Sequence, residues 1–134
     1  EIALPNDSVN VIIVSHVLEH VDNDVRALKE LYRILAPGGR LLIQVPLSGK
    51  SATIEDKLND PETRLATYGK TDHARLFGDD LVNRIADAGF SVTIHRAHDD
   101  PYAGRFSSMA LDLPEDSNML YDNESTTFEC RKTG

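Results

Sequence analysis

Apolar residues in the first part of the chain form two strand-like runs with a helical pattern between them. Residues 9–14 are β-branched and almost continuously apolar, which is typical of a strand covered on both faces, as in a parallel sheet. Residues 41–45 form a second run of this kind, which ends at Pro46. Both runs therefore predict buried strands.

Apolar residues between these two runs recur at helical spacing. Residues 22–24, Asp-Asn-Asp, offer oxygens for an N-cap, and residues 36–39, Ala-Pro-Gly-Gly, are expected to end the helix. The stripe expected to face the core is Val25, Leu28, Leu31, Tyr32 and Leu35. A strand, a helix, a glycine turn and a strand in this order predict a right-handed βαβ unit.

Further elements are expected after residue 46. A short helix is predicted near residues 60–66, inside a stretch from 47 to 77 whose length is typical of covers and binding loops. Residues 78–89 predict a helix, and residues 90–97 predict a strand. A second long connection is expected at 98–122, and a last strand at 125–131. The alternation of strands and helices predicts an α/β fold.

The composition limits the class of protein. The 134 residues fit one domain. No apolar run reaches the roughly 18 residues of a membrane-spanning helix, so no membrane partner is expected. A net charge of −8 without clustered Lys and Arg disfavours nucleic acid as a partner. The single cysteine, Cys130, rules out an internal disulfide and fits a reducing compartment, so a cytoplasmic location is expected.

Residues 16–20 contain His-x-x-Glu-His, a zinc-peptidase signature in which two histidines bind the metal. Both histidines must then project from one face of a helix, with a third ligand elsewhere. His16, however, follows the first strand by two residues, and the helix signals begin only at Asp22. His16 and His20 should therefore straddle a strand-to-helix connection. No completing ligand suggests itself, so the sequence predicts neither zinc proteolysis nor a metal site.

The position of this connection indicates a different role. Ligands of open α/β sheets bind just beyond the carboxyl ends of parallel strands. Residues 15–17, Ser-His-Val, stand at such an end, which predicts contact with a ligand. Leu18 and Val21 are predicted to be core residues, and Glu19 is interpreted as a carboxylate that suits the positive start of the coming helix.

Three segments share an order of motifs with a known enzyme family. Residues 4–46, LPNDSVNVIIVSHVLEHVDNDVRALKELYRILAPGGRLLIQVP, hold Leu-Pro, then Leu-Glu-His after a strand, then Arg-x-Leu-x-Pro-Gly-Gly before the next. The segments YGKTDHAR (68–75) and TTFECRK (126–132) follow. Together they resemble the second half of class I S-adenosylmethionine-dependent methyltransferases of the small-molecule type. Val9-Asn10 stands where Phe-Asp is usual, a mild departure. The resemblance covers nearly the whole chain.

The resemblance implies a Rossmann-like sheet to which this chain contributes the fourth to seventh strands with flanking helices, the last strand being antiparallel. Residues 1–134 would be the C-terminal portion of a single methyltransferase domain, because the family's glycine-rich cofactor loop is not in this sequence. It also implies S-adenosyl-L-methionine as cofactor and a small molecule as methyl acceptor. Ile2, Ser15, His16 and Val17 would face the cofactor.

Acceptor-side residues are expected in the same connection and in the long stretch after it. His16, His73 and Arg75 are predicted to bind the acceptor, since arginine can hold a carboxylate or phosphate with two parallel hydrogen bonds. His73 and His20 are the candidates for a catalytic base. Two structural alternatives stay open. His20 could cap the coming helix, and Arg75 could form ion pairs with Asp72 or Asp79 in its own loop.

Two hypotheses of different class follow for the chain as a whole. The first is an enzyme that transfers methyl groups to a small molecule. The second is a non-catalytic or truncated scaffold without the cofactor loop. In either case the strand at residues 9–14 would leave a long apolar sheet edge, so self-association through that edge is expected.

Overall fold

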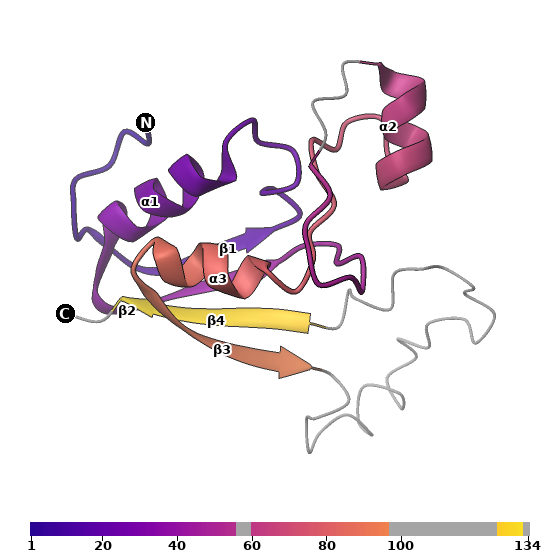
Figure 1. The fold of residues 1–134 in the computed structure, drawn as a ribbon. Helices are drawn as coiled ribbons and strands as arrows, with labels where there is room; N and C mark the ends of the chain where they lie inside the picture. Colours follow the sequence, from indigo (N-terminus) through magenta and orange to yellow (C-terminus); the bar gives the residue numbers. More distant parts are fainter. Residues whose placement is uncertain (56–59, 97–125, 133–134) are drawn as a thin grey trace, which may run out of the picture.

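The computed structural model describes residues 1–55, 60–96 and 126–132 (Figure 1). Its elements are β1 (Val9–Ser15), α1 (Asp24–Ile34), β2 (Leu35–Gln44), α2 (Pro61–Tyr68), α3 (Leu81–Asp87), β3 (Phe90–Arg96) and β4 (Thr126–Lys132). The strands form one sheet in the order β1-β2-β4-β3. This arrangement confirms the predicted α/β class. The connection expected at 98–122 lies outside the described residues. No helix within the described ranges has both the length and the apolar character needed to cross a membrane.

β1, α1 and β2 form the βαβ unit that the sequence predicts. The two strands pair in parallel as far as Ser15 and Gln44. α1 ends at Ile34 and β2 begins at Leu35, whereas the prediction began this strand at residue 41. The register of the pair shifts near the start of β1, so residues 36–39 form an irregular beginning of β2 and not a separate turn.

The last strand lies inside the sheet and not at its edge. β4 runs antiparallel to both neighbours, and Cys130 lies opposite Leu41 of β2 and Val92 of β3. The antiparallel final strand is thus confirmed. Cys130 is fully buried, and this burial raises the pKa of its thiol to about 12. The thiol is therefore protonated and unreactive at neutral pH.

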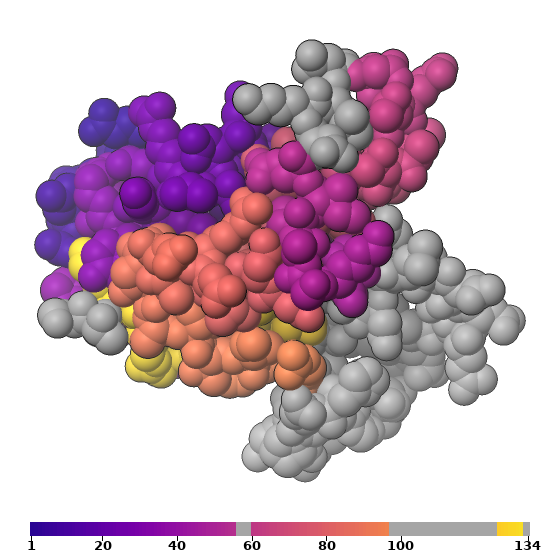
Figure 2. Space-filling model, in the orientation of Figure 1, coloured from indigo at the N-terminus to yellow at the C-terminus, as the bar shows by residue number. Residues whose placement is uncertain are grey.

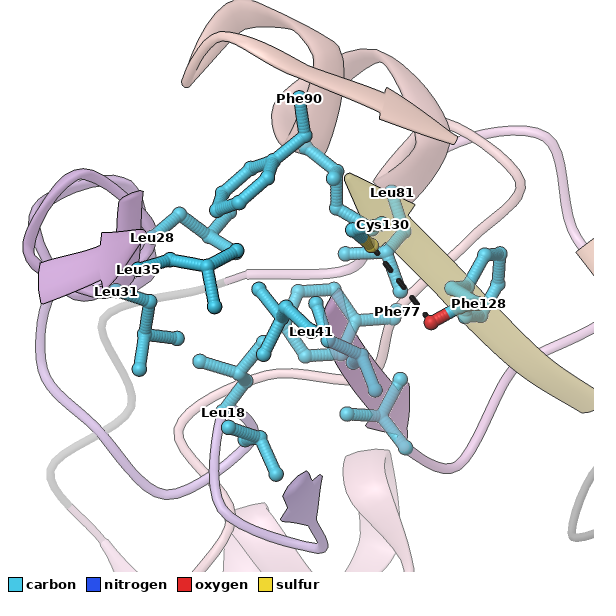
Figure 3. Packing of buried hydrophobic residues seen from close by; sticks show 14 of the residues in the cluster. Leu18, Leu28, Leu31, Leu35, Leu41, Phe77, Leu81, Phe90, Phe128 and Cys130 are labelled. Atoms are coloured by element: carbon cyan, nitrogen blue, oxygen red, sulfur yellow. Dashed lines mark hydrogen bonds between the residues drawn. The ribbon is translucent and has the colours of Figure 1, made fainter. Parts of the chain in front are cut away.

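The hydrophobic core lies on the face of the sheet that α1 and α3 cover (Figures 1 and 3). α1 contributes Leu28 and Leu31, and α3 contributes Leu81 and Ile85. The sheet residues that meet them are Leu41, Ile43, Phe90, Phe128 and Cys130. Removing these apolar side chains from water is the main force that holds the two helices to the sheet.

The buried stripe of α1 differs from the prediction at both ends. Asp24 is buried while Val25 is 43 % exposed, because the Asp24 carboxylate accepts a hydrogen bond from Arg84 of α3 at 2.8 Å. At the other end Ile34 is buried in addition to the predicted Leu35. The first buried position of α1 is therefore filled by an ion pair, which an apolar pattern does not reveal.

β1 is not covered on both faces, contrary to the expectation from its apolar run. Val11 and Ile13 are 56 % and 71 % exposed, whereas Val14 on the other face is buried. Within the described residues β1 also ends the strand order, so its outer edge has no partner strand. An apolar strand with a free edge is prone to pair with another chain.

The stretch after β2 packs against the chain around α3, and Figure 2 shows these two segments side by side. Ile54 pairs with Leu76 in an isolated bridge. Gly78 lies so close to the Ala52 backbone that a Cβ would come within 2.4 Å of it, so only glycine fits there. The short helix predicted near residues 60–66 is observed as α2, which stands apart from the sheet in Figure 1.

Candidate functional site

The connection between β1 and α1, residues 16–23, begins with a residue in an unfavourable backbone conformation. We refer to it below as the connection. His16 has a φ of +53°, which costs a non-glycine residue about 1–2 kcal/mol. Its amide donates to the Gln44 carbonyl at 2.9 Å, and Ser15 Oγ lies 3.4 Å from Gln44 Oε1. Ser15, His16 and Val17 are all exposed. The strained turn thus presents these side chains beyond the carboxyl ends of β1 and β2, where open α/β sheets bind ligands.

The His-x-x-Glu-His motif does not lie on one helix. α1 begins only at Asp24, and Asn23 is its N-cap, with Oδ1 accepting from the Arg26 amide at 2.8 Å. His16 and His20 therefore straddle the strand-to-helix connection, as predicted. The geometry of the zinc-peptidase signature is absent from residues 16–20.

Glu19 lies at the centre of a group of imidazoles. Its side chain is 0 % exposed, and its Oε1 is 3.3 Å from His16 Nδ1 and 3.9 Å from His20 Nε2. The His20 ring meets the His73 ring edge-on, with 4.8 Å between the ring centroids. Neither Glu19 oxygen has a hydrogen-bond partner among the described residues. We refer to Glu19, His20 and His73 as the histidine–glutamate cluster.

His73 is the buried imidazole of this cluster. Its side chain is 6 % exposed, and its Nδ1 has no hydrogen-bond partner in the part of the chain that the structure describes. Burial, together with the neighbouring His20, lowers the pKa of His73, although the charge of Glu19 acts in the opposite direction. The ring is therefore neutral at neutral pH and keeps a nitrogen lone pair.

The segment 72–75 holds the connection in place through backbone contacts. The Ala74 amide donates to the Glu19 carbonyl at 2.7 Å, and His20 Nδ1 lies 3.1 Å from the Asp72 carbonyl. Because a carbonyl can only accept, His20 Nδ1 must carry the proton. The other nitrogen of a neutral His20, Nε2, then has its lone pair on the side of Glu19.

Arg75 is placed differently from the expectation that it binds an acceptor anion. Its side chain is 1 % exposed, and its donors bond the carbonyls of Leu18, Val21 and Asp22 and the carboxylate of Glu55. All five N–H groups of the guanidinium are used by the protein, so none is left for a substrate. Arg75 instead fixes the backbone that carries His16 and His20. Its ion-pair partner Glu55 lies in the same stretch, 47–77, whereas the three carbonyls lie outside it.

Ile2 is held by α1. Its amide donates to Glu30 Oε2 at 3.0 Å, and Arg33 donates to its carbonyl at 2.9 Å and to the Leu4 carbonyl at 2.8 Å. The Ile2 side chain is 38 % exposed. The structure therefore fixes the backbone of this predicted cofactor-side residue while leaving its side chain accessible.

The comparison with protein families places this site in a known context. Residues 1–95 match the family model described as a methyltransferase domain. The chain belongs to this methyltransferase-domain family. The matched residues include β1, the connection after it and the whole histidine–glutamate cluster. The resemblance to class I methyltransferases is thereby confirmed.

Individual relatives are also methyltransferases, but they match very different shares of this chain. The ubiquinone/menaquinone biosynthesis C-methyltransferase UbiE of Vibrio campbellii is 42 % identical over 43 residues, which are 32 % of this chain and 17 % of UbiE. The solved S-adenosylmethionine-dependent methyltransferase of Mesorhizobium loti superposes with a TM-score of 0.62 at 18 % identity. That superposition covers 98 % of this chain and 66 % of the other.

The same fold also serves a different reaction. The [4+2]-cyclase SpnF superposes with a TM-score of 0.59 at 15 % identity, over 99 % of this chain and 53 % of SpnF. Such low identities show the fold alone, which is the expected Rossmann-like methyltransferase fold. Function in this methyltransferase-family chain must therefore be argued from the site and not from the fold.

Sequence reasoning missed two carboxylates of the site. Glu19 was expected to serve the start of the helix, but α1 begins five residues later and Glu19 is buried beneath the imidazoles. Glu55 was not singled out, yet its carboxylate binds Arg75 at 2.8 Å. The central place of Glu19 between two histidines was the available signal. Nothing in the sequence near Glu55 indicates its partner, which lies 20 residues away.

Proposed function

We propose that this chain takes part in S-adenosylmethionine-dependent methyl transfer to a small-molecule acceptor. The observation that supports this most is the family match over residues 1–95, which includes the connection exposed at the carboxyl ends of β1 and β2. Open α/β sheets bind their ligands at this edge. The chain spans 66 % of the Mesorhizobium loti methyltransferase, so the activity is proposed for the protein as a whole.

The residues of the connection fit one side of a nucleoside. Ser15 offers a hydroxyl that can bind a ribose or amino-acid group, and Val17, 46 % exposed, offers an apolar surface for a base. We assign Ser15, His16 and Val17, with Ile2, to the cofactor side. When bound, the cofactor supplies a methyl group already activated on a sulfonium, so these residues need only orient it and exclude water.

The acceptor side is assigned to His16, His20 and His73. His20 is the accessible member of the cluster, with a side chain 37 % exposed, and its Nε2 lone pair can take the proton that an oxygen or nitrogen acceptor loses on methylation. His73, packed edge-on against His20, orients that ring. Arg75 and the Asp72 carbonyl keep the connection in position.

A binding experiment with matched variants tests the cofactor assignment. Isothermal titration of S-adenosylhomocysteine into the natural full-length protein should give a Kd that Val17→Glu weakens by about tenfold or more, since a charge replaces apolar contact at the base. Val25→Glu is the control, because Val25 is similarly exposed, at 43 % against 46 %, but lies on α1. An equal Kd for wild type and Val17→Glu would contradict the assignment, as would an equal loss in both variants.

A further inference from the structure

The histidine–glutamate cluster has the composition of a metal site. One donor atom from each of Glu19, His20 and His73 lies within 4.8 Å of the others. We propose that these three side chains bind a divalent first-row transition ion such as Zn²⁺. The sequence pattern alone did not indicate a further ligand for residues 16–20. In the fold His73, which is 53 positions beyond His20 in the chain, lies beside them.

The free donor atoms point to a ligand that the protein itself does not provide. Both Glu19 oxygens and His73 Nδ1 are buried without a hydrogen-bond partner among the described residues. His16 Nδ1 lies 3.3 Å from Glu19 Oε1 but forms no hydrogen bond with it. A buried carboxylate without a hydrogen bond is unfavourable, and so is a buried nitrogen lone pair without one. A cation between them would satisfy the carboxylate and both imidazoles at once.

The orientation of His20 is the one that metal-binding histidines adopt. Its Nδ1 donates to the Asp72 carbonyl at 3.1 Å, which leaves Nε2 as the atom with a lone pair on the side of Glu19. Histidines that bind metals almost always donate their second N–H to a carbonyl or carboxylate in this way, which fixes the tautomer and the ring. The backbone of the segment 72–75 therefore supplies the supporting contact as well as the ligand His73.

The ligand set and its exposure define the kind of ion. Two imidazoles and one carboxylate suit Zn²⁺, Fe²⁺ or Co²⁺, whereas Mg²⁺ and Ca²⁺ prefer oxygen ligands. Two atoms bound at about 2.1 Å to one ion are at most roughly 4.2 Å apart, so the cluster must contract slightly on binding. Glu19 and His73 are buried but His20 is exposed, so the site borders solvent, and three protein ligands leave a further coordination position for a molecule from solution. Sites with three protein ligands and an open position are typical of catalytic metals.

A bound ion would change how the acceptor is activated. It would occupy the His20 lone pair, and the acceptor oxygen or nitrogen could bind at its open position, where loss of the acceptor's proton to a solvent water would be easier. This consequence rests on the proposed function, because it places the acceptor beside the cluster. Metal binding itself does not rest on it and can be measured without cofactor.

The test is a titration of the chelator-treated, natural full-length protein with Co²⁺, followed by absorption, and competition with Zn²⁺. We expect one ion per chain and visible bands of four- or five-coordinate Co²⁺ that Zn²⁺ abolishes. His20→Ala and Glu19→Gln should each weaken binding by about tenfold or more. The matched control is His95→Ala, because His95 Nε2 also contacts a glutamate, Glu129 at 3.1 Å, but on the exposed face of β3.

The outcomes separate this inference from the proposed function. Absence of stoichiometric binding in the wild type would overturn it, and so would binding that survives His20→Ala or falls equally in His95→Ala. Circular dichroism identifies a variant that fails to fold, and His20 is the exposed ligand whose removal disturbs the core least. If S-adenosylhomocysteine binds and Co²⁺ does not, only the metal site is lost. If Co²⁺ binds and S-adenosylhomocysteine does not, only the methyl-transfer proposal is lost.

Discussion

At the scale of single residues, Arg75 shows how a charged side chain can serve the site without touching a ligand. Its guanidinium joins three carbonyls of the connection to Glu55. Arg75→Lys removes the planar fork and leaves buried carbonyls unpaired, so the free energy of unfolding should fall by about 2–4 kcal/mol. Urea denaturation measures this. Arg26 on α1 is exposed, so the free energy of unfolding of Arg26→Lys should stay within about 0.5 kcal/mol of wild type. A similar loss in both variants would show that the hydrogen bonds of Arg75 do not stabilise the connection.

The backbone of His16 allows a cleaner comparison. His16→Gly and His16→Ala both remove the imidazole, but only glycine accepts a φ of +53° without strain. His16→Gly should therefore be more stable than His16→Ala by about 1 kcal/mol in thermal or urea unfolding. At the neighbouring Val17 the order should reverse, because glycine there only adds freedom to the unfolded chain. The same order at both positions would mean that the turn is not strained.

These residues also show what the sequence could and could not tell about the site. The location of Ser15, His16 and His20 at and after the carboxyl end of β1 was predictable, because the end of a strand is a local feature of the sequence. The burial of Glu19, His73 and Arg75 was not, because it arises only when residues 72–75 pack on the connection more than fifty positions earlier. Local patterns hold no information on such contacts.

At the scale of elements, the N-terminal segment depends on an ion pair at the end of α1. Arg33 binds Glu30 at 2.9 Å, and both hold Ile2. Hydrogen bonds from Arg33 and from the Ile2 amide lower the pKa of Glu30 from 4.5 to about 2. A carboxylate with a lowered pKa stabilises the fold above its ordinary pKa, and that stabilisation is lost as the pH falls towards 2.

The Glu30→Gln variant tests this linkage. At pH 7 it should melt at a lower temperature than wild type, and the difference between the two proteins should shrink as the pH falls from about 5 to about 2. Thermal melts of both proteins across this range give the measurement. A difference that is constant with pH would show that the carboxylate charge is not what holds the segment.

Most elements were predictable from periodicity, and the errors share one origin. The first two strands follow from almost continuous apolar runs, and α1 follows from apolar residues with a period of 3.6. Residues 36–39, which were expected to separate α1 from the second strand, instead form the beginning of β2. Periodicity counted Val25 as buried and missed Asp24, because Arg84 on another helix makes a buried aspartate favourable. It also expected β1 to be covered on both faces, since apolar residues alone do not say which neighbours a strand has.

At the scale of the whole molecule, β1 has an outer edge without a partner strand within the described residues. We propose that the chain self-associates through this edge strand, whose uncovered face carries Ile13 with 71 % exposure. Light scattering coupled to size exclusion should show a mass that rises with concentration for the 134-residue chain. Ile13→Lys should lower the measured mass towards that of the monomer, whereas the control Val25→Lys, on α1, should leave it unchanged. A monomer at every concentration would exclude the proposal.

The place of β4 has a consequence for biosynthesis. This strand joins β2 to β3, yet it is made from residues 126–132, long after both neighbours have been translated. While those residues are still inside the ribosome, no strand lies between β2 and β3. Leu41 and Val92 then lack Cys130, the residue that pairs with both of them in the sheet. The nascent chain therefore keeps an incomplete sheet until residues 126–132 emerge, and during this period its unpaired strand edges are exposed to aggregation.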